Sequence, residues 1–166
     1  MASEGYLIAK AQKQGQIKGS VTQKGKEGWI AVYGFHHEIV SPRDVASGLA
    51  TGKRQHKPLT ITKEIDRSTP LLYQALVNNE SFPEVVLRFF APDPKGLGNE
   101  NQVYTIRLTN AIITSIVDDM ANIKMADNSR IPLLEMISFT YQRIDWTWND
   151  GAITSTDSWE TKSPAV

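Results

Sequence analysis

Hydrophobic and polar residues alternate along most of this chain, and alternation of this kind is typical of half-buried β-strands. In the first half, segments rich in β-branched and aromatic residues are separated by glycine, proline or charged residues. These segments predict strands at residues 6–10, 16–22, 29–35 and 58–65. Lys63 interrupts the apolar positions of the last of them.

The second half alternates over longer stretches. Residues 85–90 predict one strand, and a stripe at every second position from Tyr104 to Ile116 predicts another of more than ten residues. The apolar positions then change parity, which happens at a β-bulge or where both faces of a strand are buried. One set of positions is Ile137, Phe139 and Tyr141, and the other is Ile144, Trp146 and Trp148.

One helix and a closing hairpin complete the predicted elements. Ser68 or Thr69 can cap a helix that has Pro70 in its first turn, and the helix is expected at about residues 69–78. The sequence Asn-Asp-Gly at residues 149–151 suits a tight turn before a last strand at 152–159. We therefore predict a mainly β fold, an antiparallel β-barrel of two packed sheets with one short flanking α-helix.

The segment from Ser41 to His56 shows no period and is rich in small residues. Loops of this length in a compact domain are often functional or mobile, and composition alone also allows a disordered surface excursion. Both interpretations stay open from the residues alone.

The composition of the chain argues against several classes of function. The 166 residues fit one domain, residues 1–166, and 18 basic residues balance 18 acidic ones. A general nucleic-acid binder carries a basic surplus, so nucleic acid is not an expected partner. The absence of cysteine excludes disulfides and thiolate sites. The N-terminus has no signal peptide and no apolar run is long enough to span a membrane, so we expect synthesis in the cytoplasm and no membrane insertion.

Candidate catalytic groups are sparse. His36 and His37 are adjacent and point to opposite faces of a strand, and the spacing to His56 matches no metal-binding motif, so we predict neither a metal nor a cofactor. The pair Asp118–Asp119 stands without convergent polar neighbours, and a solvated loop explains it better than acid–base catalysis. No catalytic motif is found, and an enzyme is not expected.

Three segments together resemble the hemolysin-coregulated protein family, whose members are tube subunits of the bacterial type VI secretion system. Residues 59–75 resemble that family's strand, Lys-Glu-Ile-Asp, Ser-Thr-Pro and helix signature. Residues 141–159 look like the family's last hairpin, and residues 6–21 resemble its opening strands. The resemblance spans nearly the whole chain.

The resemblance implies a homo-hexameric ring that stacks with further rings into a tube. It also implies sheath, spike and effector proteins as partners, effector binding in the ring lumen, and secretion without a signal peptide. The chain ends seven residues after Trp159, so no C-terminal toxin domain is expected. Interface residues are expected in two groups. Those predicted to contact the next ring are Arg43, Asp44, Val45, Leu49, Lys53 and Arg54, and those predicted at the lateral interface are Ile144, Trp146 and Trp148.

Two alternatives remain. A monomeric β-barrel of about eight strands can carry a small apolar ligand in its interior. A hydrolase would have to use Asp118, Asp119 or His37.

Overall fold

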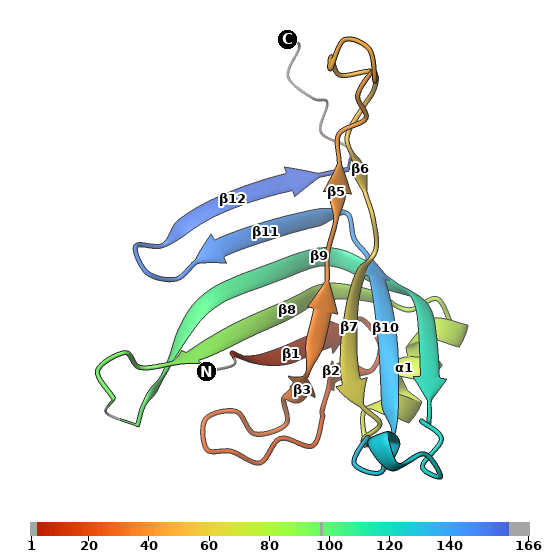
Figure 1. Ribbon diagram of the computed structural model, residues 1–166, viewed down its shortest axis with the longest axis vertical. Helices are drawn as coiled ribbons and strands as arrows, with labels where there is room; N and C mark the ends of the chain where they lie inside the picture. Colours follow the sequence, from red (N-terminus) through yellow and green to blue (C-terminus); the bar gives the residue numbers. More distant parts are fainter. Residues whose placement is uncertain (1–2, 97, 160–166) are drawn as a thin grey trace.

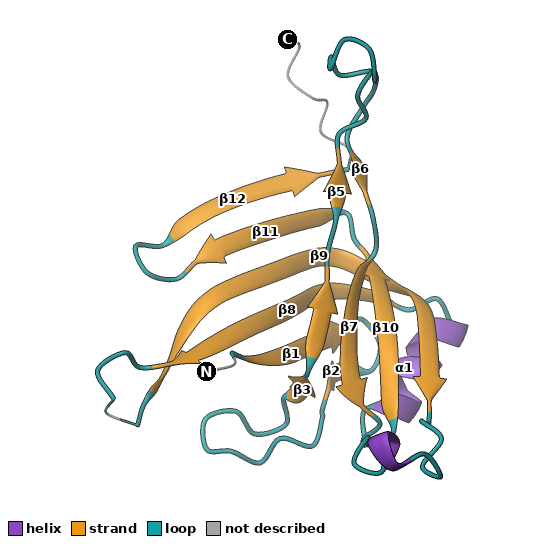
Figure 2. Ribbon diagram, viewed as in Figure 1, coloured by secondary structure: helices purple, strands orange, loops and turns teal. Residues whose placement is uncertain are grey.

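Antiparallel β-strands dominate the computed structural model, which describes residues 3–96 and 98–159 (Figures 1 and 2). This part of the chain forms a main sheet of ten strands and a separate sheet of two strands. The expectation that no further domain follows depends on residues 160–166, which lie outside the described residues.

The strands and helices follow the chain in this order: β1 (Glu4–Ala11), β2 (Gly15–Ile17), β3 (Ile30–Val32), β4 (Gly34–His36), β5 (Ile39–Val40), β6 (Gln55–His56), β7 (Leu59–Glu64), α1 (Thr69–Val77), β8 (Ser81–Pro92), β9 (Glu100–Asp119), the short 3₁₀ helix η1 (Ala126–Asn128), β10 (Leu134–Thr140), β11 (Arg143–Trp148) and β12 (Ile153–Ser158).

The main sheet bends around the long strand β9. Its hydrogen-bonded path runs β2-β1-β8-β9-β10-β7-β4, and β3 pairs with β1. The first part of β9 also pairs with β11, which carries β12 as its hairpin partner, whereas the second part pairs with β10. The mainly β, antiparallel fold with one flanking α-helix is confirmed. The two terminal strands of the path, β2 and β4, are not paired with each other, so the sheet is not a fully closed barrel.

The core lies between the two parts of the bent sheet. Leu7, Leu87 and Leu108 from one part face Ile61 and Phe139 from the other, and all five are completely buried. Burying each such side chain stabilises the fold by about 1.5–3 kcal/mol.

The change of parity near residue 142 has a different cause from the two that we expected. The chain leaves the sheet at Tyr141 and Gln142, so β10 and β11 are separate strands on different parts of β9. The apolar set of each strand faces the same core: Phe139 is fully buried in β10, and Ile144 is fully buried in β11. Neither a β-bulge nor burial of both faces of one strand therefore explains this change of parity.

Two predicted strands are also shorter than the alternation suggests. The strand expected at residues 16–22 ends at Ile17, and residues 18–28 form a loop. The strand expected at residues 29–35 divides at Tyr33 into β3 and β4, because β3 pairs with β1 whereas β4 pairs with β7.

Helix α1 begins as predicted, but the expected side-chain cap is not formed. Pro70 lies in its first turn, and Leu72 and Ala75 are buried against the sheet. No side chain caps a backbone N–H group of this helix. The Ser68 hydroxyl instead donates a hydrogen bond to the Asp66 carboxylate.

Candidate assembly surfaces

The segment expected as an irregular loop is a hairpin that we call the arm, residues 41–54. It continues the two-stranded sheet of β5 and β6, and an isolated β-bridge joins Arg43 to Ala50. The arm projects from one end of the molecule's longest axis (Figure 1). The structure shows a hairpin where the sequence suggested an irregular loop.

The arm tip is a tight turn that presents apolar side chains to solvent. The Asp44 carboxylate accepts hydrogen bonds from the Ala46 N–H at 3.2 Å and the Ser47 hydroxyl at 2.7 Å, and these bonds lower the pKa of Asp44. Val45 is fully exposed and Leu49 is 69% exposed. Exposed aliphatic side chains on a projecting turn are characteristic of a contact surface.

The arm base is bonded to the end of β12 and is not free in solvent. The guanidinium of Arg54 forms a two-point ion pair with the Asp157 carboxylate, and the Lys53 ammonium donates a hydrogen bond to the Trp159 carbonyl. The predicted inter-ring set is therefore divided. Arg43, Asp44, Val45 and Leu49 lie on the arm beyond its base, whereas Lys53 and Arg54 bind their own chain.

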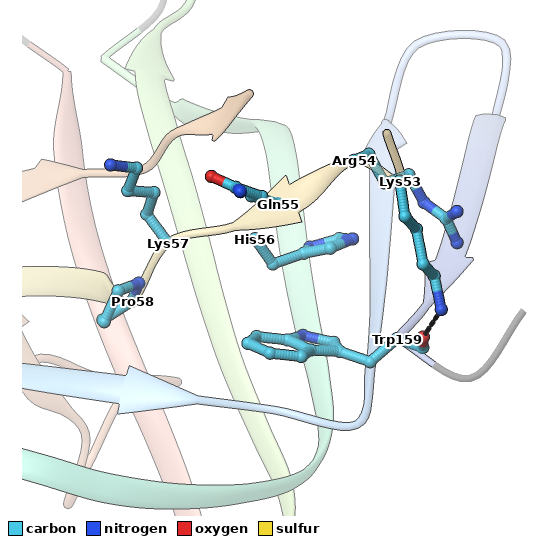
Figure 3. Close-up of a pocket in the computed structure, with 7 residues that line it drawn as sticks. All are labelled: Lys53, Arg54, Gln55, His56, Lys57, Pro58 and Trp159. Atoms are coloured by element: carbon cyan, nitrogen blue, oxygen red, sulfur yellow. Dashed lines mark hydrogen bonds between the residues drawn. The ribbon is translucent and has the colours of Figure 1, made fainter. Parts of the chain in front are cut away.

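His56 completes this attachment. Its Nδ1 lies 2.8 Å from the Tyr141 hydroxyl and its Nε2 lies 2.7 Å from the Asp157 carboxylate. Its ring also stacks on the indole of Trp159, and the two rings are seen together in Figure 3. Hydrogen bonds from Arg54 and then from His56 lower the pKa of Asp157 from 3.8 to about 2. No pattern in the sequence points to this cluster, because Asp157 is 101 residues from His56.

A pocket of about 400 Å³ lies beside the cluster, lined by residues 53–58 and Trp159 (Figure 3). Both ring nitrogens of His56 already have partners, so the imidazole has no free nitrogen to act as a general base on a bound molecule. The arrangement fastens the arm to β12.

The hairpin of β11 and β12, which we call the C-terminal ribbon, carries the predicted lateral residues. Ile144 is fully buried in the core of its own chain, so its assignment to a lateral interface is wrong. Trp146 is half-buried against that core. Trp148 is 48% exposed and pairs across the ribbon with Ile153, which is 67% exposed.

The ribbon also forms one edge of the main sheet. β12 pairs with β11 and with no other strand of the described chain, so its outer edge leaves backbone groups unpaired. Exposed edges of this kind accept strands from other chains.

The residues considered for hydrolysis are far apart. Asp118 lies opposite Glu135 at the start of β10, whereas His37 packs against Tyr141 beyond the end of that strand. Six residues of strand place them about 20 Å apart. Burial lowers the pKa of His37, and neither of its ring nitrogens has a hydrogen-bond partner. The structure does not bring these three residues into one site.

The described ranges contain no group of three or more histidine, aspartate or glutamate side chains placed to bind a metal ion. No helix within them combines the length and the apolar character needed to cross a membrane.

These features define the class as an antiparallel β-protein with a projecting arm and an open edge strand. The chain belongs to the family described as "Type VI secretion system effector, Hcp", whose model matches residues 7–148. This is a family of structural secretion-system proteins and not a known family of enzymes, and its members form ring assemblies.

Relatives of the chain support this assignment over almost its full length. The "Major exported protein" of Pseudomonas aeruginosa is 35% identical over 175 residues, which cover 100% of this chain and 99% of the relative. The Hcp1 protein of the E. coli EAEC 042 pathovar is 30% identical with a TM-score of 0.83, over 95% of this chain and 99% of that one. The secreted protein Hcp3 from Pseudomonas aeruginosa is 30% identical with a TM-score of 0.76, over 96% and 100% of the two chains.

Proposed function

We propose that this chain is a structural subunit of the type VI secretion inner tube, which forms hexameric rings that stack and bind effectors in their lumen. The observation that carries the proposal is that this member of the Hcp family exposes two apolar surfaces, one at the arm tip and one at the edge of the ribbon. A subunit of a stacked ring needs both an axial and a lateral contact surface.

The lateral contact is assigned to the C-terminal ribbon. Trp148 and Ile153 expose a cross-strand apolar pair next to the unpaired edge of β12. Six copies arranged head to tail would bury this edge in a heterologous, closing contact, which gives a ring instead of a fibre.

The axial contact is assigned to the arm. Its tip lies at one end of the longest axis, and the loop around η1 lies at the other (Figure 1). That loop exposes Met120, Ile123 and Met125, and these match the apolar character of Val45 and Leu49. The arm of one ring can therefore meet the far end of a subunit in the next ring.

Further partners follow from the proposal. A tube subunit contacts sheath, spike and effector proteins, and it leaves the producing cell without a signal peptide. The relative named "Major exported protein" supports export of this chain.

Light scattering of the purified protein tests the ring. Six chains of 18.5 kDa give a particle of about 111 kDa, and we expect this mass at micromolar concentration. A particle of one chain's mass over the same concentration range would refute the proposal.

Electron microscopy of an arm variant tests stacking. Val45→Asp combined with Leu49→Asp places charges on the arm tip, and we expect hexameric rings that no longer form tubes. Thr51→Asp is the control, because it adds a charge to the arm without removing an apolar side chain. Tubes of normal length from the double variant would show that the arm tip does not make the axial contact.

A further inference from the structure

The face of β8, β9, β11 and β12 that points away from the core is polar and carries three arginines. These strands lie side by side in the main sheet (Figure 1). Arg88 on β8 pairs with Thr105, Arg107 on β9 pairs with Asp145, and Arg143 on β11 pairs with Thr109. The pairing puts all of these side chains on one face of the sheet.

The three arginines form a diagonal, which we call the arginine diagonal. Each step from Arg88 to Arg107 and from Arg107 to Arg143 crosses one strand and moves two residues along it. Strand spacing and rise make each step about 8 Å. Alternate side chains of an extended peptide are spaced by about 7 Å, so successive carboxylates at every second residue match this diagonal.

The guanidinium groups keep donors available for a ligand. Arg107 is about half exposed and has a single ion-pair contact, 4.0 Å from Nε to the Glu84 carboxylate. Arg143 is 54% exposed, and it donates hydrogen bonds to one carboxylate oxygen of Asp145 at 3.1 Å and, through Nε, to the Thr156 hydroxyl at 3.1 Å. A guanidinium has five N–H donors and prefers two-point contact with a carboxylate.

The side chain of Arg88 is held in place by an aromatic ring. Its guanidinium carbon lies 5.1 Å from the ring centroid of Trp29, which restrains the side chain from one side. Its Nε is buried and has no hydrogen-bond partner. A buried donor without a partner costs free energy unless a ligand satisfies it.

A depression of about 530 Å³ contains the diagonal. Its lining also includes the hydroxyls of Thr105, Thr147 and Thr154, which can bind the backbone of a ligand. None of the ten lining residues is aromatic, so the depression offers no surface for base stacking. Two carboxylates, Glu84 and Asp145, stand beside the three arginines and leave a surplus of one positive charge among these five side chains.

We propose that the arginine diagonal binds an extended acidic segment of a polypeptide, with carboxylates at every second residue, through Arg88, Arg107 and Arg143. This inference rests on the proposed function, since it names the chemistry of the cargo that a tube subunit would carry. In a ring, six copies of the diagonal would act together and strengthen the binding of a long segment.

Fluorescence anisotropy with a labelled peptide tests the inference. The probe has roughly ten residues that alternate glutamate with serine, long enough to cross the diagonal when extended. We expect it to bind the wild type, and to bind about tenfold more weakly to the double variant Arg107→Gln, Arg143→Gln. Both side chains are half exposed, so the fold should tolerate the change. Arg130→Gln is the matched control on the exposed loop before β10 and should bind like the wild type.

Each contrary outcome is informative. Equal binding by the double variant and the wild type, equal binding of a lysine–serine peptide, or no binding at all would overturn the inference. A single-stranded oligonucleotide that binds more tightly than the peptide and loses affinity in the double variant would assign the diagonal to nucleic acid and overturn it as well. Light scattering of the same samples separates the two proposals. Hexamers that ignore the peptide contradict only the inference, and monomers that bind it contradict only the proposed function.

Discussion

At the scale of single residues, two buried polar clusters fix the arrangement of the chain. Lys63 stands at a core position of β7 and is fully buried, and its ammonium pairs with Glu135 of β10, which is 1% exposed. The ammonium also lies 3.1 Å from the Asp66 carboxylate, and the Thr69 hydroxyl donates to Glu135 at 2.9 Å. The cluster therefore joins β7, β10 and the start of α1.

Replacing Lys63 alone should be costly. Lys63→Met leaves Glu135 buried without its cation, and we expect the free energy of unfolding to fall by about 3–5 kcal/mol in urea titrations. Burial already raises the pKa of Glu135. The double variant Lys63→Met, Glu135→Leu should regain most of the loss, and exposed Lys124→Met serves as the control. A loss below about 1 kcal/mol for the single variant would contradict the role of the pair.

Asp157 should make stability depend on acid pH. Its pKa of about 2 is below its ordinary value of 3.8, so folding favours the ionised carboxylate. This stabilisation is complete well above pH 4 and is lost as the pH falls through 3.8 toward 2. Asp157→Asn should cost about 1–3 kcal/mol at neutral pH and progressively less toward about pH 2. Urea unfolding at several pH values measures this difference, and a gap that stays constant with pH would argue against it. Asp150→Asn, in the exposed turn of the ribbon, is the control.

Alternation predicted the burial of most core residues but not the identity of these partners. Lys63 shares its parity with Leu59 and Ile61, and that parity is the signal for its burial. Glu135 likewise shares its parity with Ile137 and Phe139, but which side chains pair across the sheet could not be predicted, because pairing between distant segments is set by sheet register.

At the scale of elements, local patterns predicted which segments are strands better than they predicted where strands divide. The stripe from Tyr104 to Ile116 lies in one strand, β9, but its buried positions change parity after Leu108, where Asn110 has a positive φ and Ala111 and Ile113 are buried next. The break at Tyr141 and Gln142 depends on β10 and β11 choosing different parts of β9. This difference in pairing depends on tertiary structure, and its only trace in the sequence is the change of parity.

The C-terminal ribbon should lose its lateral contact when its apolar pair is charged. Ile153→Lys places an ammonium opposite Trp148, and we expect the hexamer to dissociate while the fold persists, because Ile153 is largely exposed in the single chain. Size-exclusion chromatography and circular dichroism measure the two properties. Thr147→Lys is the control on the opposite face of the same ribbon. An intact hexamer from Ile153→Lys would remove this pair from the interface.

At the scale of the whole molecule, the bent sheet buries one core yet leaves its borders open. The family resemblance in the sequence predicted this fold, and the family membership confirms it. Whether the sheet closes could not be predicted, because closure depends on how the segment of β3 and β4 divides its pairing between β1 and β7. In the proposed ring, neighbouring chains would cover these open borders and add to the stability of the molecule.

Thermal stability should therefore depend on protein concentration. A ring binds only folded chains, so the melting temperature should rise when the protein is concentrated from about 1 to about 100 µM. Scanning calorimetry at several concentrations measures the shift. The Ile153→Lys variant should show none, and a wild type that melts at one temperature throughout would mean that assembly adds nothing to stability.

The attachment of the arm base has a mechanical consequence. Arg54 and Lys53 anchor the arm to the end of β12, and β12 is bonded through β11 to the first part of β9. A force on the arm tip is therefore transmitted to β9 through β12 and β11. It is also transmitted along the two chain segments that lead to β5 and β6. The arm is braced at its base, so in the proposed tube it should transmit an axial load with less bending than a loop attached only through its two chain ends.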